Sequence, residues 1–334
     1  MVTKACTAAF LLVLILHGCD NSKPVHLKYT ASGSEPEVLA VYEAWFGHPN
    51  HIQVGYSSDK PAEMRMQIAE ARRMGISGFV VDWYGDRSPY INRNYGRMQK
   101  LAAKAGFKVA MMYDQAQQAD GATDEAIAEL KMFHREYLRR SAPGRQAYLM
   151  YRGHPVIFVF PHGNSTNWDE VRAAVNQWNP RPFLIDENLP GKYGKDFDGF
   201  YPWINPGPKG WAANGSHWGG QYLRSFYTTM TEKFEDKIIV DGAWPRFNDK
   251  RASWSLDRHM SARCGQTLKD TLNFWKKYVP ANQTIPFVLI ETWNDYEEGS
   301  DIESGLPACG GQATPRALQD FEVPRNQAKK QARN

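Results

Sequence analysis

The sequence lacks the signals of several common protein classes. It has only four cysteines in 334 residues and no paired histidine motif. Its longest apolar run is about half of the roughly 20 residues that span a bilayer. These absences argue against a zinc site and against a stable transmembrane helix. We therefore expect no cofactor and no metal ion.

The body of the chain also has little excess of positive or negative charge. The net charge is +4, but from Arg316 onward five basic residues face two acidic ones, so most of the excess belongs to the tail. Residues 314–334 show no apolar periodicity, and their composition predicts disorder. The remainder is close to neutral, which gives no support for binding to nucleic acid.

The first nineteen residues are a predicted signal peptide. Lys4 precedes the short apolar run AAFLLVLIL, as in export signals. The following LHGC resembles a bacterial lipobox with Cys19 as the lipidated residue, although the unusual His17 leaves a plain cleaved signal peptide open. Asp20 resembles the signal that keeps some lipoproteins in the inner membrane. We expect an exported protein on the periplasmic side, with the lipid anchor as its only contact with a membrane.

Two cysteines would remain after processing, Cys264 and Cys309. An oxidising compartment permits a disulfide between them. Two buried free thiols are the alternative.

Eight short apolar runs, mostly separated by helix-like segments, recur between a polar linker at 20–37 and the tail. The runs cover residues 38–45, 76–84, 107–114, 154–161, 181–187, 198–204, 237–244 and 285–295. The clearer helices are expected at 60–75, 91–106, 123–138, 167–178 and 266–278.

Apolar strands that alternate with helices indicate a parallel sheet covered on both faces. Eight such units over about 260 residues match the size of a (β/α)₈ barrel. The sequence therefore predicts a single TIM barrel, with its domain at residues 38–313. A doubly wound open sheet is the alternative, but no glycine-rich phosphate loop follows the first strand. Only a short helix, ATPRALQDF, would follow the eighth strand.

Carboxylates and aromatic residues recur where the predicted strands end. Active sites of such barrels lie at these ends. Aromatic faces pack on sugar rings, and carboxylates accept hydrogen bonds from hydroxyl groups. The pattern predicts a saccharide cleft, with simple packing as the alternative for each residue. The candidate substrate contacts are Tyr42, Glu43, Trp45, Asp82, Trp83, Tyr84, Tyr113, Trp203, Trp244, Glu291, Trp293 and Asn294.

The stretch ETWNDYEEGSDIESG, which begins at Glu291, places six carboxylates after the apolar run IPFVLI. It is compatible with a solvated loop, a metal loop or a catalytic pair. An EF-hand needs glycine at position 6, but counted from Asp295 the glycine falls at position 5. The interleaved Trp293, Tyr296 and Ile302 argue against a purely solvated loop. A general acid/base pair is the remaining interpretation, because glycoside hydrolysis needs two carboxyl groups.

The segment WNDYEEGSDIE resembles the signature of the endo-acting α-glycosidases of glycoside hydrolase families 99 and 71. Three further segments are similar to family 99: YEAWFG at 42–47, GISGFVVDWYG at 75–85 and FNDKR at 247–251. Both families are (β/α)₈ barrels with two acidic residues three positions apart. Two departures are that Asp295 stands where family 99 has Glu, and that Glu297 adds an acid.

The resemblance implies Glu298 as the general acid/base and Asp295 as the second catalytic carboxylate. In family 99 the residue matching Asp295 is thought to deprotonate the sugar 2-hydroxyl with retention, and in family 71 a water is activated with inversion. Glu291 and Glu303 are expected to support the pair, whereas Glu297 and Asp301 are expected to be solvated.

Two neighbours after the seventh run, Asp249 and Arg251, are expected to pair with each other.

The expected activity is hydrolysis of internal α-glycosidic linkages in an α-mannan or α-glucan. The alternative is a non-catalytic lipoprotein on a degenerate hydrolase barrel, which would bind glycans or assist polysaccharide synthesis.

Overall fold

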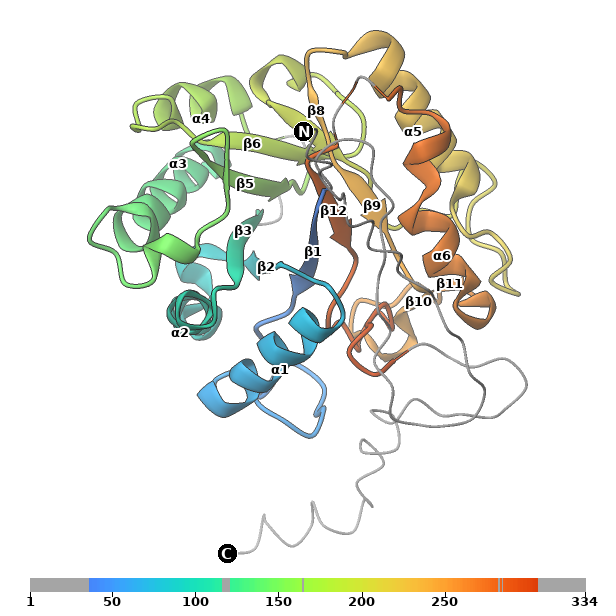
Figure 1. Ribbon diagram of the computed structural model, residues 1–334, viewed down its shortest axis with the longest axis horizontal. Helices are drawn as coiled ribbons and strands as arrows, with labels where there is room; N and C mark the ends of the chain where they lie inside the picture. Colours follow the sequence, from blue (N-terminus) through green and yellow to red (C-terminus); the bar gives the residue numbers. More distant parts are fainter. Residues whose placement is uncertain (1–35, 116–120, 164, 282, 284, 306–334) are drawn as a thin grey trace, which may run out of the picture.

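A parallel sheet closes on itself at the centre of the molecule (Figure 1), in the strand order β8-β7-β6-β5-β3-β2-β1-β12-β9. Only Val240 separates β8 from β9, and these two pieces pair with β7 and β12 respectively. They act as one interrupted strand, so the barrel has eight strand positions. The strands are β1 (Glu37–Tyr42), β2 (Gly78–Trp83), β3 (Lys108–Asp114), β5 (His154–Phe160), β6 (Phe183–Glu187), β7 (Gly199–Tyr201), β8 (Ile238–Ile239), β9 (Asp241–Ala243) and β12 (Phe287–Ile290).

Each of the eight apolar runs contains one of these strand positions, which confirms the predicted single TIM barrel. This computed structural model describes residues 36–115, 121–163, 165–281, 283 and 285–305. The predicted signal peptide with Cys19, nearly all of the linker, the helix ATPRALQDF and the tail lie outside these residues. Cys264 is disulfide-bonded, but Cys309 also lies outside them, so their pairing stays a prediction.

Helices surround the barrel (Figure 1), and all five expected helices are present. The helix α5 was not among them, although its buried positions repeat with helical spacing. A 3₁₀ turn replaces a helix between β6 and β7. None of the described helices is both long and apolar enough to cross a bilayer. The helices are α1 (Pro61–Arg73), α2 (Pro89–Ala105), α3 (Ala122–Phe133), α4 (Trp168–Val175), α5 (Gly220–Lys233) and α6 (Gln266–Leu272).

Local sequence signals explain where the helices begin and end. Both α1 and α2 start with a proline, whose fixed φ suits the first turn of a helix. The side chain of Ser88 accepts a hydrogen bond from the Ile91 N–H at the start of α2. Gly106 ends that helix with a left-handed φ of 63°, a conformation that glycine adopts without strain.

Two short strands lie outside the barrel wall. The strand β4 (Met150–Tyr151) forms a hairpin with β5, and β10 (Phe247–Asn248) pairs with β11 (His259–Met260). The second pair frames the loop after β9, which returns to the open end of the barrel.

Alternation along each strand separates side chains that fill the barrel from those that face the helices. In β1, Leu39 and Val41 belong to the inner core, whereas Val38, Ala40 and Tyr42 belong to the outer one. The same alternation holds in β2 and β3. The first residue after β1 therefore returns to the inner row, and this places the site.

Candidate active site

Three adjacent strands each direct a carboxylate inward at the C-terminal end of the barrel, which we call the mouth. Glu43 follows β1, Asp82 lies in β2 and Asp114 ends β3. All three are buried. Burial raises the pKa of Glu43 and of Asp82, and the charges of neighbouring carboxylates raise both further.

Hydrogen bonds fix these carboxylates in a row. The Tyr84 hydroxyl donates to Asp82 Oδ2 at 2.8 Å, whereas Asp82 Oδ1 and Glu43 Oε2 have no hydrogen-bond partner among the described residues. His162 Nε2 lies 2.9 Å from Asp114 Oδ1. This contact raises the pKa of His162, because the carboxylate favours the charged imidazole.

A tight turn after β12 carries Asp295 and Glu298. Asp295 Oδ1 accepts backbone N–H bonds from Glu297 at 2.9 Å and from Glu298 at 2.8 Å. The Asp295 N–H donates to Thr292 Oγ1 at 2.7 Å. Burial raises the pKa of Asp295, the charge of Glu298 raises it further, and the two N–H bonds partly oppose both effects.

The loop after β9 holds the carboxylate of Glu298. Trp254 Nε1 donates to Glu298 Oε1 at 2.9 Å, and Arg258 Nη2 lies 3.5 Å from the same oxygen. Arg258 is anchored by the buried Asp249, with 2.6 Å between Nε and Oδ2. Burial raises the pKa of Glu298, while Trp254 and Arg258 hold it lower than burial alone would.

The row on β1–β3 and the turn after β12 belong to one site. The charges of Asp295 and Glu298 both raise the pKa of Glu43, so these groups interact across the mouth. Asn294 ties the two sides together. Its Oδ1 accepts from the Glu43 N–H at 2.7 Å, and its Nδ2 donates to the Glu43 carbonyl at 3.0 Å.

Aromatic side chains stand beside the carboxylates. Trp45 stacks on His51 with 4.7 Å between ring centroids. Tyr84 and Trp254 each lie 6.2 Å from Trp45. Across the barrel, the partly exposed Trp203 packs against Phe160 of β5. The mouth thus combines acceptors with flat apolar surfaces.

Five of the expected substrate contacts lie in the outer core instead of at the mouth. All five are buried, and strand alternation directs Tyr42, Trp83 and Tyr113 toward the helices. Tyr42 donates to Gln67 of α1 at 2.7 Å, and Tyr113 donates to Glu129 of α3 at 2.6 Å. These five residues are Tyr42, Trp83, Tyr113, Trp244 and Trp293.

Two further expected substrate contacts, Asn294 and Glu291, are also fully buried. The side chain of Asn294 bonds to the backbone of Glu43. Glu291 directly follows β12, and neither of its buried oxygens has a hydrogen-bond partner among the described residues. Burial raises the pKa of Glu291 well above its ordinary value, and the charges of Glu187 and Asp241 raise it further.

Two acids that were expected to be solvated are buried, so that expectation was wrong. Glu297 is 2% exposed. It accepts from the Ile52 N–H at 3.1 Å and contacts His51 Nδ1 at 2.8 Å. Asp301 is 3% exposed and pairs with Arg246 at 2.9 Å. Both contacts hold the turn after β12 against neighbouring loops of the barrel.

The remaining acids of this region are also held by partners. Glu303 accepts from Tyr56, Gln67 and Tyr296. We expected Asp249 to pair with Arg251, and this was wrong. Asp249 pairs with Arg258 instead.

Several groups at the mouth were not among the expected substrate contacts. Asp114 occupies the inward position that ends β3, and alternation counted from Met112 would have found it. His162 follows β5 in the same way. Trp254 and Arg258 come from an irregular loop, and their sequence gives no comparable signal. No cluster of three or more His, Cys, Asp or Glu with metal-binding geometry occurs among the described residues.

The buried acids predict how stability depends on pH. Burial raises the pKa of Glu187 to about 7 and that of Asp186 to about 8. Between the ordinary carboxyl pKa and these values the folded protein binds more protons than the unfolded chain. The free energy of unfolding therefore falls as the pH rises from about 4 through about 8.

Glu291→Gln is expected to flatten this dependence, because the amide needs no proton to stay neutral. The Tm of the variant relative to wild type should be about 2–4 °C more favourable at pH 8 than at pH 5. Thermal unfolding at both pH values measures this difference. An equal difference at the two pH values would show that Glu291 is ionised in the folded protein.

Comparisons with known proteins agree with this architecture. No protein-family model and no curated protein matches the sequence. Solved structures do match it, among them two structures of a GH99 endo-α-mannosidase from Bacteroides thetaiotaomicron. One has a TM-score of 0.61 at 16% identity and covers 89% of this chain and 98% of its own. The other, in complex with bis-tris-propane, has a TM-score of 0.59 at 19% identity and covers 80% and 87%.

A further matching structure is that of a glycoside hydrolase-like protein, with a TM-score of 0.59 at 13% identity, covering 89% of this chain and 97% of its own. At these identities the likeness concerns the fold. The chain therefore has a GH99-like (β/α)₈ fold.

Proposed function

We propose that the protein is a glycoside hydrolase that cleaves internal α-linkages of an α-mannan or α-glucan. Glu298 is the general acid/base and Asp295 is the second carboxylate. The observation that carries this proposal is the placement of both acids on one turn at the mouth, where aromatic rings and further carboxylates face them. Two carboxyl groups beside a scissile bond are what glycoside hydrolysis requires.

Glu298 has the properties of the proton donor. Its raised pKa favours the protonated form, which the leaving glycosidic oxygen needs. Trp254 and Arg258 engage Oε1, and this leaves Oε2 to meet the substrate. The side chain is 17% exposed, so a ligand in the mouth can reach it.

We assign Asp295 as the group that accepts a proton, although burial and the charge of Glu298 raise its pKa as well. The N–H groups of Glu297 and Glu298 stabilise negative charge on its Oδ1, and Oδ2 is then the oxygen that faces a sugar hydroxyl or a water. Either acceptor is compatible with this arrangement. A hydroxyl of the same sugar leads to retention, and a water leads to inversion.

The other groups at the mouth bind the sugar. Glu43 and Asp82 have raised pKa values, and one oxygen of each has no hydrogen-bond partner among the described residues, so these oxygens can bond to sugar hydroxyl groups. Trp45, Tyr84 and Trp254 supply faces on which a sugar ring packs. These contacts bind a neutral sugar in a water-poor site.

A panel of reduced α-mannan and α-glucan oligosaccharides, with β-linked oligosaccharides as controls, tests the proposal. We expect new reducing ends only from the α-linked members, and internal fragments before monosaccharides. Failure to cleave every α-linked member would contradict the proposed function. Release of monosaccharides alone would contradict the endo-acting part.

Trp254→Phe is expected to shift the pH dependence of kcat/KM. The indole N–H lowers the pKa of Glu298, so its removal raises that pKa and keeps the acid protonated to higher pH. The alkaline limb should move up by about half a pH unit, on the scale of 1.36 kcal/mol per pKa unit. A shift in the opposite direction in the pH–rate profile would disprove this role of Trp254.

A further inference from the structure

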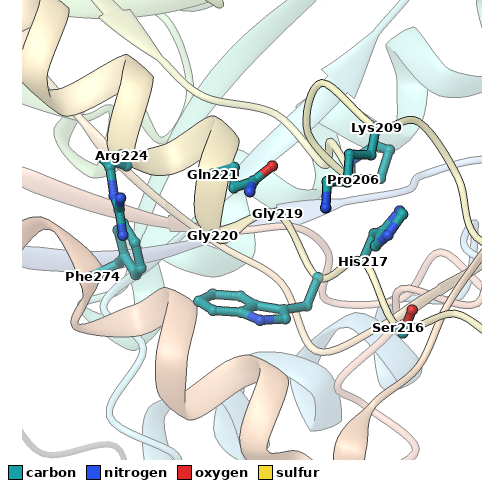
Figure 2. Close-up of a pocket in the computed structure, with 10 residues that line it drawn as sticks. Pro206, Lys209, Ser216, His217, Gly219, Gly220, Gln221, Arg224 and Phe274 are labelled. Atoms are coloured by element: carbon teal, nitrogen blue, oxygen red, sulfur yellow. The ribbon is translucent and has the colours of Figure 1, made fainter.

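A cavity lies at the same end of the barrel, between the loop after β7 and the start of α5 (Figure 2). Its volume is about 280 Å³. None of the residues assigned to the mouth lines it. Ligand pockets usually measure about 300–1,000 Å³, so this one suits a single small unit, such as one sugar residue.

The lining is cationic. Lys209, His217 and Arg224 line the cavity, and no Asp or Glu is among its lining residues. Figure 2 shows Lys209 and His217 on one side and Arg224 on the other. Within the described part of the chain, Lys209 and Arg224 have no acidic partner in an ion pair. The cavity therefore presents positive charge that the fold does not neutralise.

Hydrogen bonds orient two of these groups. The Gly210 carbonyl can only accept, so His217 Nδ1 carries a proton and donates to it at 2.7 Å. In this tautomer Nε2 is an acceptor, which a hydroxyl group of a ligand can meet. Arg224 Nε donates to the Tyr278 hydroxyl at 3.1 Å, so the remaining guanidinium nitrogens keep their donors for a ligand.

An aromatic ring and the start of a helix complete the cavity. Trp218 lines it, and the Arg263 guanidinium lies 4.5 Å from the indole centroid. A Cβ on Gly220 would come within 2.6 Å of the Trp218 ring, so only glycine lets α5 begin this close to the indole. The first N–H groups of α5 have no side-chain cap.

We propose that this cavity is a subsite for an anionic sugar residue, one that bears a carboxylate or a sulfate ester. An indole beside cationic groups matches a sugar ring with one negative substituent. The inference rests on the proposed hydrolase function and specifies its substrate class. The carboxylates at the mouth repel an anionic sugar, whereas Lys209 and Arg224 attract it. The substrate is then a glycan in which an acidic residue occurs near a neutral α-linked one.

Binding of monosaccharide probes to the Glu298→Gln variant tests this subsite without turnover. The probes are methyl α-glucuronoside, the 6-sulfate of methyl α-glucoside, neutral methyl α-glucoside and sodium sulfate. Calorimetry gives affinities, and NMR of indole N–H groups reports contact with Trp218. We expect at least one anionic glycoside to bind about tenfold more tightly than the neutral one, as for one charge-assisted hydrogen bond. The anionic glycoside that binds more tightly shows whether the cavity prefers a carboxylate or a sulfate ester.

Lys209→Met should remove most of this preference for the anionic glycoside. Lys233→Met is the matched control, because it removes the same charge from the distant end of α5 and should leave binding unchanged. Equal affinity for charged and neutral glycosides would overturn the proposal. So would sulfate alone binding as tightly as the charged glycosides, since the sugar would then not be recognised.

The outcome is independent of the hydrolase test. Absence of binding here leaves cleavage of neutral α-linked oligosaccharides untouched. Binding here together with no cleavage in the oligosaccharide panel would leave an anionic-sugar site and contradict only the catalytic proposal.

Discussion

Glu298→Gln is expected to lower kcat about 10³-fold, within the range of about 10²–10⁴ for general acid–base catalysis. The amide keeps the size of the side chain and the acceptor for Trp254 Nε1, but it has no proton to give to the glycosidic oxygen. The folded state should survive, because the variant removes a carboxylate whose ionisation burial opposes. Hydrolysis rates on an α-linked oligosaccharide, together with thermal unfolding, measure both effects.

Asp257→Asn is the matched control for this experiment. Asp257 lies in the loop that carries Trp254, but its side chain is 78% exposed and contacts only Lys250 among the ion pairs described. Its neutralisation should leave kcat within about twofold of wild type, as for surface substitutions. Full activity in Glu298→Gln would contradict the assignment of Glu298 as the acid.

Asp249→Ala is expected to be the most destabilising change considered for this protein. Asp249 is fully buried and pairs with Arg258 at 2.6 Å. It also accepts backbone N–H bonds from Leu256 and Arg258 and a hydroxyl bond from Ser255. Its loss leaves two backbone N–H groups, a hydroxyl group and the partly exposed Arg258 without an acceptor, and at about 1 kcal/mol for each hydrogen bond the total is about 3–4 kcal/mol. Urea unfolding should show a loss of this size.

The same substitution should also lower kcat, because Arg258 and Trp254 hold Glu298 from this loop. The exposed Asp257→Asn again serves as the control, now for stability. A loss of unfolding free energy below about 1 kcal/mol, the size of one ordinary hydrogen bond, would show that the loop is held by other contacts.

The barrel was predictable because its signals are local. Eight apolar runs of strand length, separated by amphipathic helices, leave few arrangements besides a closed parallel sheet. The helices α1 and α2 carry proline at their starts, so their beginnings could be placed closely. The helix α5 was missed despite its helical spacing, because a long loop precedes it.

Side-chain direction was the weaker part of the prediction. Tyr42 and Glu43 are neighbours in sequence, yet one faces α1 and the other faces the mouth. The residue types at a strand end indicate a sugar site for both. Only the alternation counted back along β1 assigns them to different sides. That count was available from the sequence and would have removed Trp83 and Tyr113 as well.

Contacts across the chain were beyond what the sequence could indicate. Glu297 is buried by His51 and Ile52, which lie about 245 positions earlier. Trp254 reaches Glu298 from a loop with no regular structure. Such contacts depend on how the loops fold over the mouth. No local pattern distinguishes these acids from solvated ones.

The most direct test of the central claim is hydrolysis of α-linked mannan and glucan oligosaccharides in ¹⁸O-labelled water, with mass spectrometry of the products. The account predicts one ¹⁸O at each new reducing end in the wild-type reaction, and loss of this product in Glu298→Gln. Absence of labelled reducing ends from the wild-type protein, or equal labelling by the variant, would contradict it.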